Sequence, residues 1–217
     1  MKLWLGISAI VAFVIGFGIY FGIIIWTKRY TKKYVEKAQR EAIEQIRSLR
    51  NEIGVLPFEL ENYFKNKVNA YDIEGIINTV FLNKYNSKLI IANNEEFSFA
   101  CVSLKTNGET YYEVDEFDLE KYNKARLEKP ELFPNQISMY QGQNIDFLGV
   151  FESKQSLDDL FNNYFDKLNE NGMLAISLKK YSRKDLSNLL ETLKHKKIQH
   201  EISYISTRFL FITNKKQ

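Results

Sequence analysis

The sequence predicts an α/β fold, in which a mostly parallel sheet is covered by helices on both faces. From residue 88 onward, apolar runs of six to eight residues alternate with helical stretches of ten to fifteen residues. This alternation is typical of βαβ units, whose crossover helices cover both faces of a parallel sheet. The last two apolar runs adjoin each other, so we expect them to form an antiparallel pair at one edge.

Residues 1–27 are predicted to form a membrane anchor. Leu3–Trp26 is a run of 24 residues without a charge, and about 20 helical residues span a bilayer. The segment Lys28–Lys33 follows with four basic residues, which favour the cytoplasmic side and anionic lipid. We therefore expect a single-pass protein of the cell membrane with its body in the cytoplasm. A cleaved signal peptide is the alternative, but the run is long for one and no small-x-small cleavage site precedes the basic segment.

Residues 28–53 are predicted to continue the helix as a stalk. Apolar side chains recur there every three or four positions, which gives a narrow helical seam beside charged residues. The seam consists of Val35, Ala38, Ala42, Ile46, Leu49 and Ile53. A seam this narrow suits a short coiled coil, and Gly18 and Gly22 have the spacing that lets membrane helices approach closely. A homodimer through anchor and stalk is one expectation, and packing of the stalk on its own domain is the other.

Charge and cysteine content exclude some classes of function. Residues 1–50 carry nine Lys or Arg and three Asp or Glu, whereas the remainder carries 21 and 24. The body is thus mildly acidic without a basic stripe, so nucleic-acid binding is not expected. Cys101 is the only cysteine, which rules out a disulfide within the chain and fits a reducing cytoplasm. The sequence shows no zinc-ligand spacing and no phosphate-binding loop.

The body is expected to begin after residue 53, where a glycine and a proline end the stalk. Residues 54–87 should form two short helices, Phe58–Lys67 and Tyr71–Asn83, before the alternating domain 88–217. The expected strands are Lys88–Asn93, Thr110–Asp115, Ile145–Phe151, Gly172–Leu178, Gln199–Ser206 and Thr207–Thr213. The expected helices are Glu96–Lys105, Asp118–Leu127, Ser156–Leu168 and Ser182–Lys196, with Asp118 and Ser182 as N-caps.

The stretch Gln136–Tyr140 is predicted to be a reduced strand or a loop. Only residues 141–144 separate it from the next strand. A parallel crossover usually needs a dozen residues or more, so we expect Gln136–Tyr140 not to pair in parallel with Thr110–Asp115. Ile145–Phe151 should then be a central parallel strand beside Leu89–Asn93. Ligands of such sheets bind outside the carboxyl ends where the strand order reverses, so we expect a site between these two strands.

Four stretches of this pattern are similar to a single family. They are Leu89–Ser98 at the first strand and its loop, Tyr112–Asp115 at the second strand, Ile145–Val150 at the fourth and Leu168–Leu174 at the fifth. There the chain resembles the class I S-adenosylmethionine-dependent methyltransferases, a Rossmann-like family, and within it the O-methyltransferases. The last stretch is the most specific match. With its anchor and stalk, the chain also resembles membrane-anchored methyltransferases of mycoplasmas.

The resemblance implies a membrane-anchored methyltransferase with S-adenosylmethionine as its cofactor. In the family, an acidic residue at the end of the second strand accepts the ribose hydroxyls, which gives Glu113 that role. Glu152 and Ser153 fall where the family often places residues that contact the substrate. The positions that correspond to cofactor-binding residues are Ala92, Asn93, Asn94, Glu113, Gly142 and Gln143.

The chain departs from the family at the cofactor loop and at the metal positions. The family's loop is rich in glycine, because its backbone comes close to the cofactor and turns sharply into a helix. Ala92, Asn94 and Glu96 stand here instead, and asparagine alone of the three readily adopts the left-handed conformation. The acidic ligands of the metal-dependent members are missing, so we expect no divalent metal. A second hypothesis therefore stays open: an inactive methyltransferase fold that serves as a membrane-tethered binding or scaffold module.

Overall fold

The computed structural model describes residues 17–18, 20–24, 26–27, 30 and 56–215. Contacts divide the chain into two compact units, residues 1–41 and residues 42–217. The described residues of the first unit are helical. Within the described ranges, no helix is both long and apolar enough to cross a membrane. Most of the predicted anchor and nearly all of the predicted stalk lie outside these ranges.

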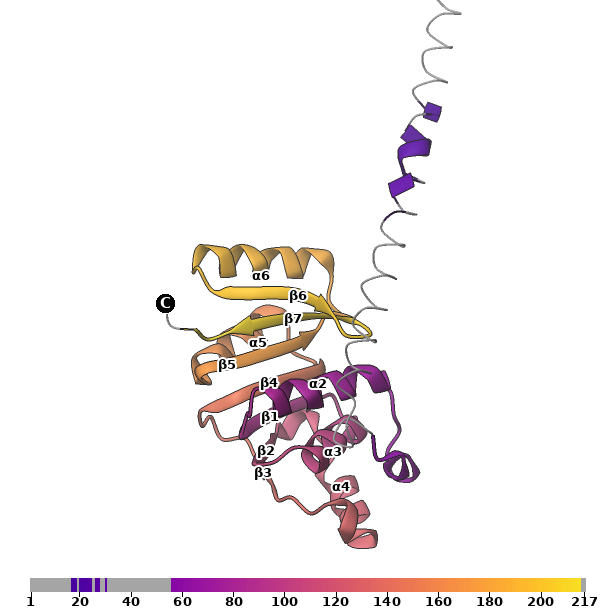
Figure 1. The fold of residues 1–217 in the computed structure, drawn as a ribbon, viewed down its shortest axis with the longest axis vertical. Coiled ribbons are helices and arrows are strands. Elements are labelled where there is room, and N and C mark those ends of the chain that lie inside the picture. Colours follow the sequence, from indigo (N-terminus) through magenta and orange to yellow (C-terminus); the bar gives the residue numbers. More distant parts are fainter. Residues whose placement is uncertain (1–16, 19, 25, 28–29, 31–55, 216–217) are drawn as a thin grey trace, which may run out of the picture. The chain divides into compact units, whose positions relative to one another are not determined.

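The second unit is built on a seven-stranded sheet (Figure 1). The spatial order is β3-β2-β1-β4-β5-β7-β6, in which the first five strands are parallel and β7 is antiparallel to both neighbours. The parallel sheet and its antiparallel C-terminal edge pair are therefore confirmed. The strands are β1 Ser87–Ala92, β2 Glu109–Tyr112, β3 Ile137–Met139, β4 Ile145–Glu152, β5 Leu168–Ser177, β6 Gln199–Tyr204 and β7 Arg208–Thr213.

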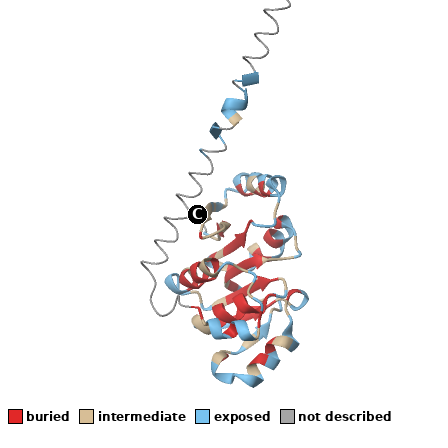
Figure 2. Cartoon of the chain, turned by 90° about the vertical axis from the view of Figure 1, so that its right-hand side faces the viewer, coloured by how far each residue is buried: buried red, intermediate tan, exposed pale blue. Residues whose placement is uncertain are grey.

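Helices cover both faces of this sheet and form a three-layer unit. The α-helices of residues 56–215 are α2 Ala70–Leu82, α3 Glu96–Lys105, α4 Leu119–Glu128, α5 Leu157–Tyr164 and α6 Arg183–His195. The first three pack on the face that carries Ile90 and Phe147, and the last two on the face that carries Leu89 and Leu148. Figure 2 shows the buried residues gathered on the strands and on the inner sides of the helices. Burial on both faces explains why the strands are continuous apolar runs.

β1 lies in the middle of the parallel part, between β2 and β4. Leu89 is level with Tyr111 of β2 and with Leu148 of β4. The predicted central position of the strand at Ile145, beside the first strand, is thus confirmed. Because the chain leaves β1 toward β2 but later returns to β4 on the other side, the strand order reverses here.

Local sequence signals set several helix starts. Asp118 caps α4 by accepting a hydrogen bond from the Lys121 amide, and Ser182 opens α6 in a capping box. Both predicted caps are confirmed. The predicted first helix of the body is only the 3-10 helix Phe58–Asn62, and α5 ends at Tyr164, before the predicted end.

The third strand is reduced to three residues, as predicted, but the prediction about its pairing is wrong. Ile137–Met139 forms β3 and pairs in parallel with Thr110–Tyr112 of β2. Six residue steps join Met139 to Ile145, and an extended chain of that length reaches about 20 Å. Met139 is level with Gly149, so the chain must return about 13 Å along β4 to reach Ile145 and cross three strand spacings, about 14 Å. The two ends are then about 19 Å apart, and a nearly fully extended connection suffices where a helix is usual. Tyr140 begins this connection and packs against the core cluster of α5 and α6, so the chain crosses on that face.

Candidate functional site

The structure brings most of the predicted site residues to one edge of the sheet. Asn93 and Asn94 follow β1, Glu113 follows β2, and Glu152 ends β4 with Ser153 after it. The carboxyl ends of these parallel strands lie side by side because β1 separates β2 from β4. We call this edge, from β2 across β1 to β4, the crevice, a name for its place in the sheet topology. It is the position where open α/β sheets bind small ligands.

The turn after β1 keeps the sharp geometry of a glycine loop without its glycines. Asn93 and Asn94 both have positive φ angles, 48° and 58°. Asparagine is among the few residues that adopt this left-handed conformation at low cost. Ala92 is buried at the end of β1, and the Asn93 side-chain amide donates a 2.8 Å hydrogen bond to Glu152 Oε1. The left-handed conformation that the sequence permits at Asn94 is thus present.

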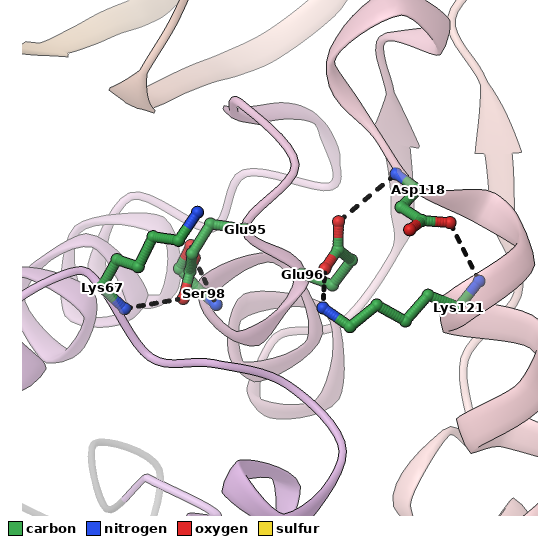
Figure 3. A network of polar contacts seen from close by, with 6 residues as sticks. All are labelled: Lys67, Glu95, Glu96, Ser98, Asp118 and Lys121. Carbon is green, nitrogen blue, oxygen red and sulfur yellow. Dashed lines mark hydrogen bonds and ion pairs between the residues drawn. The ribbon is translucent and has the colours of Figure 1, made fainter.

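Two glutamates stand at the start of α3, and both are buried. Figure 3 shows their polar contacts. Glu95 is the N-cap of α3 and accepts hydrogen bonds from the Ser98 amide at 3.1 Å and the Lys67 amide at 3.4 Å. Glu96 accepts from Lys121 Nζ at 2.7 Å and from the Asp118 amide at 3.3 Å. Burial raises the pKa of Glu95, and its hydrogen bonds oppose that shift. Both carboxylates are thus bound within the body of the protein.

Glu113 is the carboxylate with the best geometry for a ligand. It stands at the end of β2, half-buried, and accepts a 3.0 Å hydrogen bond from the Tyr164 hydroxyl of α5. Burial raises its pKa, Asp115 and Glu116 add to this, and the Tyr164 hydrogen bond opposes it. A partly desolvated carboxylate that already binds a hydroxyl can accept the hydroxyls of a ligand in the same way.

Glu152 lies on the other side of β1 and is held as an anion. Lys180, which follows β5, forms an ion pair with it, and Asn93 donates a hydrogen bond. Burial alone raises the pKa of Glu152, but these two partners outweigh it and hold the pKa below its ordinary value. In the described part of the chain, no group of three or more His, Cys, Asp or Glu side chains is arranged to hold a metal ion.

Gly142 and Gln143 lie apart from the other predicted cofactor residues. They belong to the extended connection that leads from β3 toward the amino end of β4, away from the crevice edge. With Met139 and Tyr111 they line an open hollow of about 710 Å³ beside β3. Gly142 has a φ of 87°, which suits glycine.

Three residues of the crevice could not be recognised as site residues from the sequence. Tyr164 lies on the buried side of α5 and reads as a core aromatic, and Lys180 reads as one of many surface lysines. Glu116 is buried, but in the sequence nothing separates it from the exposed Asp115 beside it. Each of the three acts on a partner more than 25 positions away. Only the folded arrangement reveals them.

Comparisons with known proteins give a likeness of fold. No protein-family model matches the chain, and no curated protein matches it at a significant level. An O-methyltransferase from Bacillus cereus, solved with SAH, superposes with a TM-score of 0.55 at 10% identity, covering 81% of this chain and 91% of that one. A SAH-bound methyltransferase from Podospora anserina gives 0.54 at 13% identity, with 88% and 96% covered.

A third solved structure extends the same comparison. The O-methyltransferase of tomaymycin synthesis from Streptomyces achromogenes, in complex with SAM, gives a TM-score of 0.51 at 10% identity. It covers 82% of this chain and 90% of that chain. At such low identities the likeness is one of fold: the body of this chain has the same fold as these solved methyltransferases.

Proposed function

We propose that this chain is an S-adenosylmethionine-dependent methyltransferase that binds its cofactor in the crevice. The observation that carries the proposal is Glu113, a half-buried carboxylate at the end of β2 beside the point where the strand order reverses. Solved proteins of the same fold were determined with SAM or SAH. Bound S-adenosylmethionine would supply an electrophilic methyl group on a sulfonium sulfur.

The residues of the crevice fit such a ligand in their chemistry. Glu113 would accept the ribose hydroxyls, and the left-handed turn at Asn93 and Asn94 brings backbone to the end of β1. The side chain of Ala92, at the end of β1, is small. Glu152 and Lys180 border the side of β4 and β5, where we place the methyl acceptor.

Thermal unfolding with and without S-adenosylmethionine tests this function. A ligand at one hundred times its Kd stabilises the folded state by about 2.7 kcal/mol. For a domain of this size, that corresponds to an upward Tm shift of about 5–10 °C. A Tm that does not move at millimolar S-adenosylmethionine or S-adenosylhomocysteine would contradict cofactor binding.

A specific observation favours a second candidate, an inactive fold kept as a binding or scaffold module. The carboxylates of the crevice already have donors within the chain: Tyr164 for Glu113, Lys180 for Glu152 and Ser153 for Glu116. Ala92, Asn94 and Glu96 also stand where the family has glycines. This candidate predicts that S-adenosylmethionine leaves the Tm unchanged. The thermal unfolding experiment therefore separates the two functions.

We further propose that residues 1–27 anchor the body to the cytoplasmic face of a membrane. The support is the uncharged run and the basic segment Lys28–Lys33. Among the described residues, Phe17, Phe21 and Trp26 expose large apolar side chains, as lipid contact requires. Around Gly18 and Gly22 a Cβ would meet nothing within 4 Å, which leaves room for a second anchor helix in a homodimer.

A further inference from the structure

One side chain ties together three loops of the crevice. Glu116 follows β2 in the 3-10 turn Val114–Glu116, and its carboxylate is buried. Its Oε1 accepts from the Ser153 hydroxyl at 2.6 Å, and its Oε2 accepts from the Lys154 amide at 3.1 Å. Its main-chain oxygen accepts from the Asn94 amide at 2.8 Å. The loops after β2, β4 and β1 therefore meet at this residue, and we call these contacts the Glu116 bridge.

The Glu116 bridge passes over the end of β1. β1 lies between β2 and β4, so a bond from the loop of β2 to the loop of β4 must span the carboxyl end of β1. This is the place that a ligand of the crevice has to occupy. The bridge also takes up the Asn94 amide, a backbone donor within the left-handed turn.

Several features strengthen the closed arrangement. Glu116 is only 4% exposed, and hydrogen bonds to a buried carboxylate are shorter and stronger than neutral ones. Gln155 Nε2 adds a longer contact to Oε1 at 3.4 Å. Lys154 Nζ donates to the main-chain oxygen of Asp115 at 2.9 Å, a second connection between the same two loops. Both oxygens of the Glu116 carboxylate thus have donors, and the bridge does not depend on one contact.

We infer that Glu116 is an internal gate of the crevice, which occupies the ligand's place with its own carboxylate until a ligand separates the loops. The inference rests on the proposed function and adds a control of access to it. Hydroxyl and amide groups that now serve Glu116 become free for the ligand when the gate opens. If the closed form dominates, the observed affinity is the affinity of the open form reduced by its small population.

The test compares Glu116→Gln with the matched control Asp115→Asn in the full-length chain. Each variant removes one negative charge from the same turn, but the Asp115 side chain is exposed. Glutamine keeps the size of Glu116 but has only one acceptor oxygen, so it cannot accept from both the Ser153 hydroxyl and the Lys154 amide. Ser153→Ala is the milder second variant, because it removes the 2.6 Å contact and leaves the charge in place.

Two measurements decide the outcome. Without ligand, amide hydrogen exchange in peptides covering residues 93–95 and 153–155 should rise about tenfold in Glu116→Gln and stay at the wild-type rate in Asp115→Asn. In calorimetric titration, S-adenosylhomocysteine should bind Glu116→Gln at least about fivefold more tightly than wild type, with Ser153→Ala in between.

Other outcomes overturn the inference, and they differ from a failure of the proposed function. Exchange in Glu116→Gln equal to that in Asp115→Asn would show that the bridge does not hold the loops. Equal or weaker binding of S-adenosylhomocysteine by Glu116→Gln, with binding by wild type intact, would show that the bridge is no gate. Absence of binding in every variant would contradict the proposed function and the gate together.

Discussion

Glu113 combines two properties that a ribose-binding carboxylate needs. It lies beside the reversal of strand order, and its present partner is a hydroxyl group, that of Tyr164 at 3.0 Å. Burial raises its pKa above the usual 4.5, so Glu113 takes up a proton at a higher pH than an ordinary glutamate does. Ligand affinity and protonation are therefore linked at this residue.

Replacing Glu113 by alanine is expected to weaken S-adenosylmethionine binding at least about tenfold, since two charge-assisted hydrogen bonds are worth roughly 1.5–3 kcal/mol each before solvent compensation. Calorimetric titration measures the change, and Glu128→Ala, an exposed position at the end of α4, is the control. Unchanged affinity in Glu113→Ala would remove this residue from the site.

The raised pKa of Glu113 gives a second prediction, with a defined sign. Binding needs the deprotonated carboxylate, so affinity should decline as the pH falls toward a pKa that lies above 4.5. The loss should therefore begin at a higher pH than for an ordinary glutamate. Wild-type affinities measured between pH 7 and pH 4 check this, and an affinity that does not fall over that interval would contradict it.

The left-handed turn at Asn94 gives a prediction about stability. Its φ of 58° suits asparagine and glycine but crowds a branched side chain. Asn94→Val should lower the free energy of unfolding by about 1–2 kcal/mol, whereas Asn94→Gly should change it by less than about 0.5 kcal/mol. Urea unfolding followed by circular dichroism measures both. Equal losses in the two variants would mean that backbone conformation is not the reason for asparagine here.

At the scale of elements, Asp146 holds the amino ends of three strands together. Near the start of β4, it accepts hydrogen bonds from the Asn86 and Ser87 amides, both at 2.9 Å, and from Asn169 Nδ2 at 2.7 Å. Burial raises its pKa, but these donors outweigh burial and leave the pKa below 3.8. The negative charge therefore stabilises the junction of β1, β4 and β5.

Asp146→Ala should lower the free energy of unfolding at pH 7 by about 1–2 kcal/mol, a value discounted because the carboxylate is partly exposed to solvent. A depressed pKa stabilises the fold above the unfolded-state pKa and loses that effect as the pH falls through the folded-state value. The difference from wild type should thus shrink below pH 3.8. Asp166→Ala, exposed before β5, is the control, and an equal loss there would contradict the assigned role.

Local signals predicted most elements but not their long-range contacts. Alternation of apolar runs and helices located β1, β4, β6 and β7, and short polar side chains marked the caps at Asp118 and Ser182. The parallel pairing of β3 was missed because crossover length was judged from helical connections, whereas this one is extended. The Glu116 bridge joins positions 37 and 38 residues apart, and spacing along the chain does not encode such contacts.

At the scale of the whole molecule, the basic segment after the proposed anchor predicts how the chain is oriented in the membrane. With Lys28–Lys33 on the cytoplasmic side, a protease added outside intact cells should leave the body undigested. The same protease should degrade the body once the membrane is permeabilised, which serves as the control. Digestion of the body in intact cells would contradict the cytoplasmic orientation.

The central claim is that the crevice binds S-adenosylmethionine, and the most direct test is a calorimetric titration of the full-length chain in detergent micelles. The account predicts saturable binding at one site per chain, competed by S-adenosylhomocysteine and weakened at least about tenfold by Glu113→Ala. Titration to millimolar S-adenosylmethionine without binding heat, and without competition between the two ligands, would contradict it.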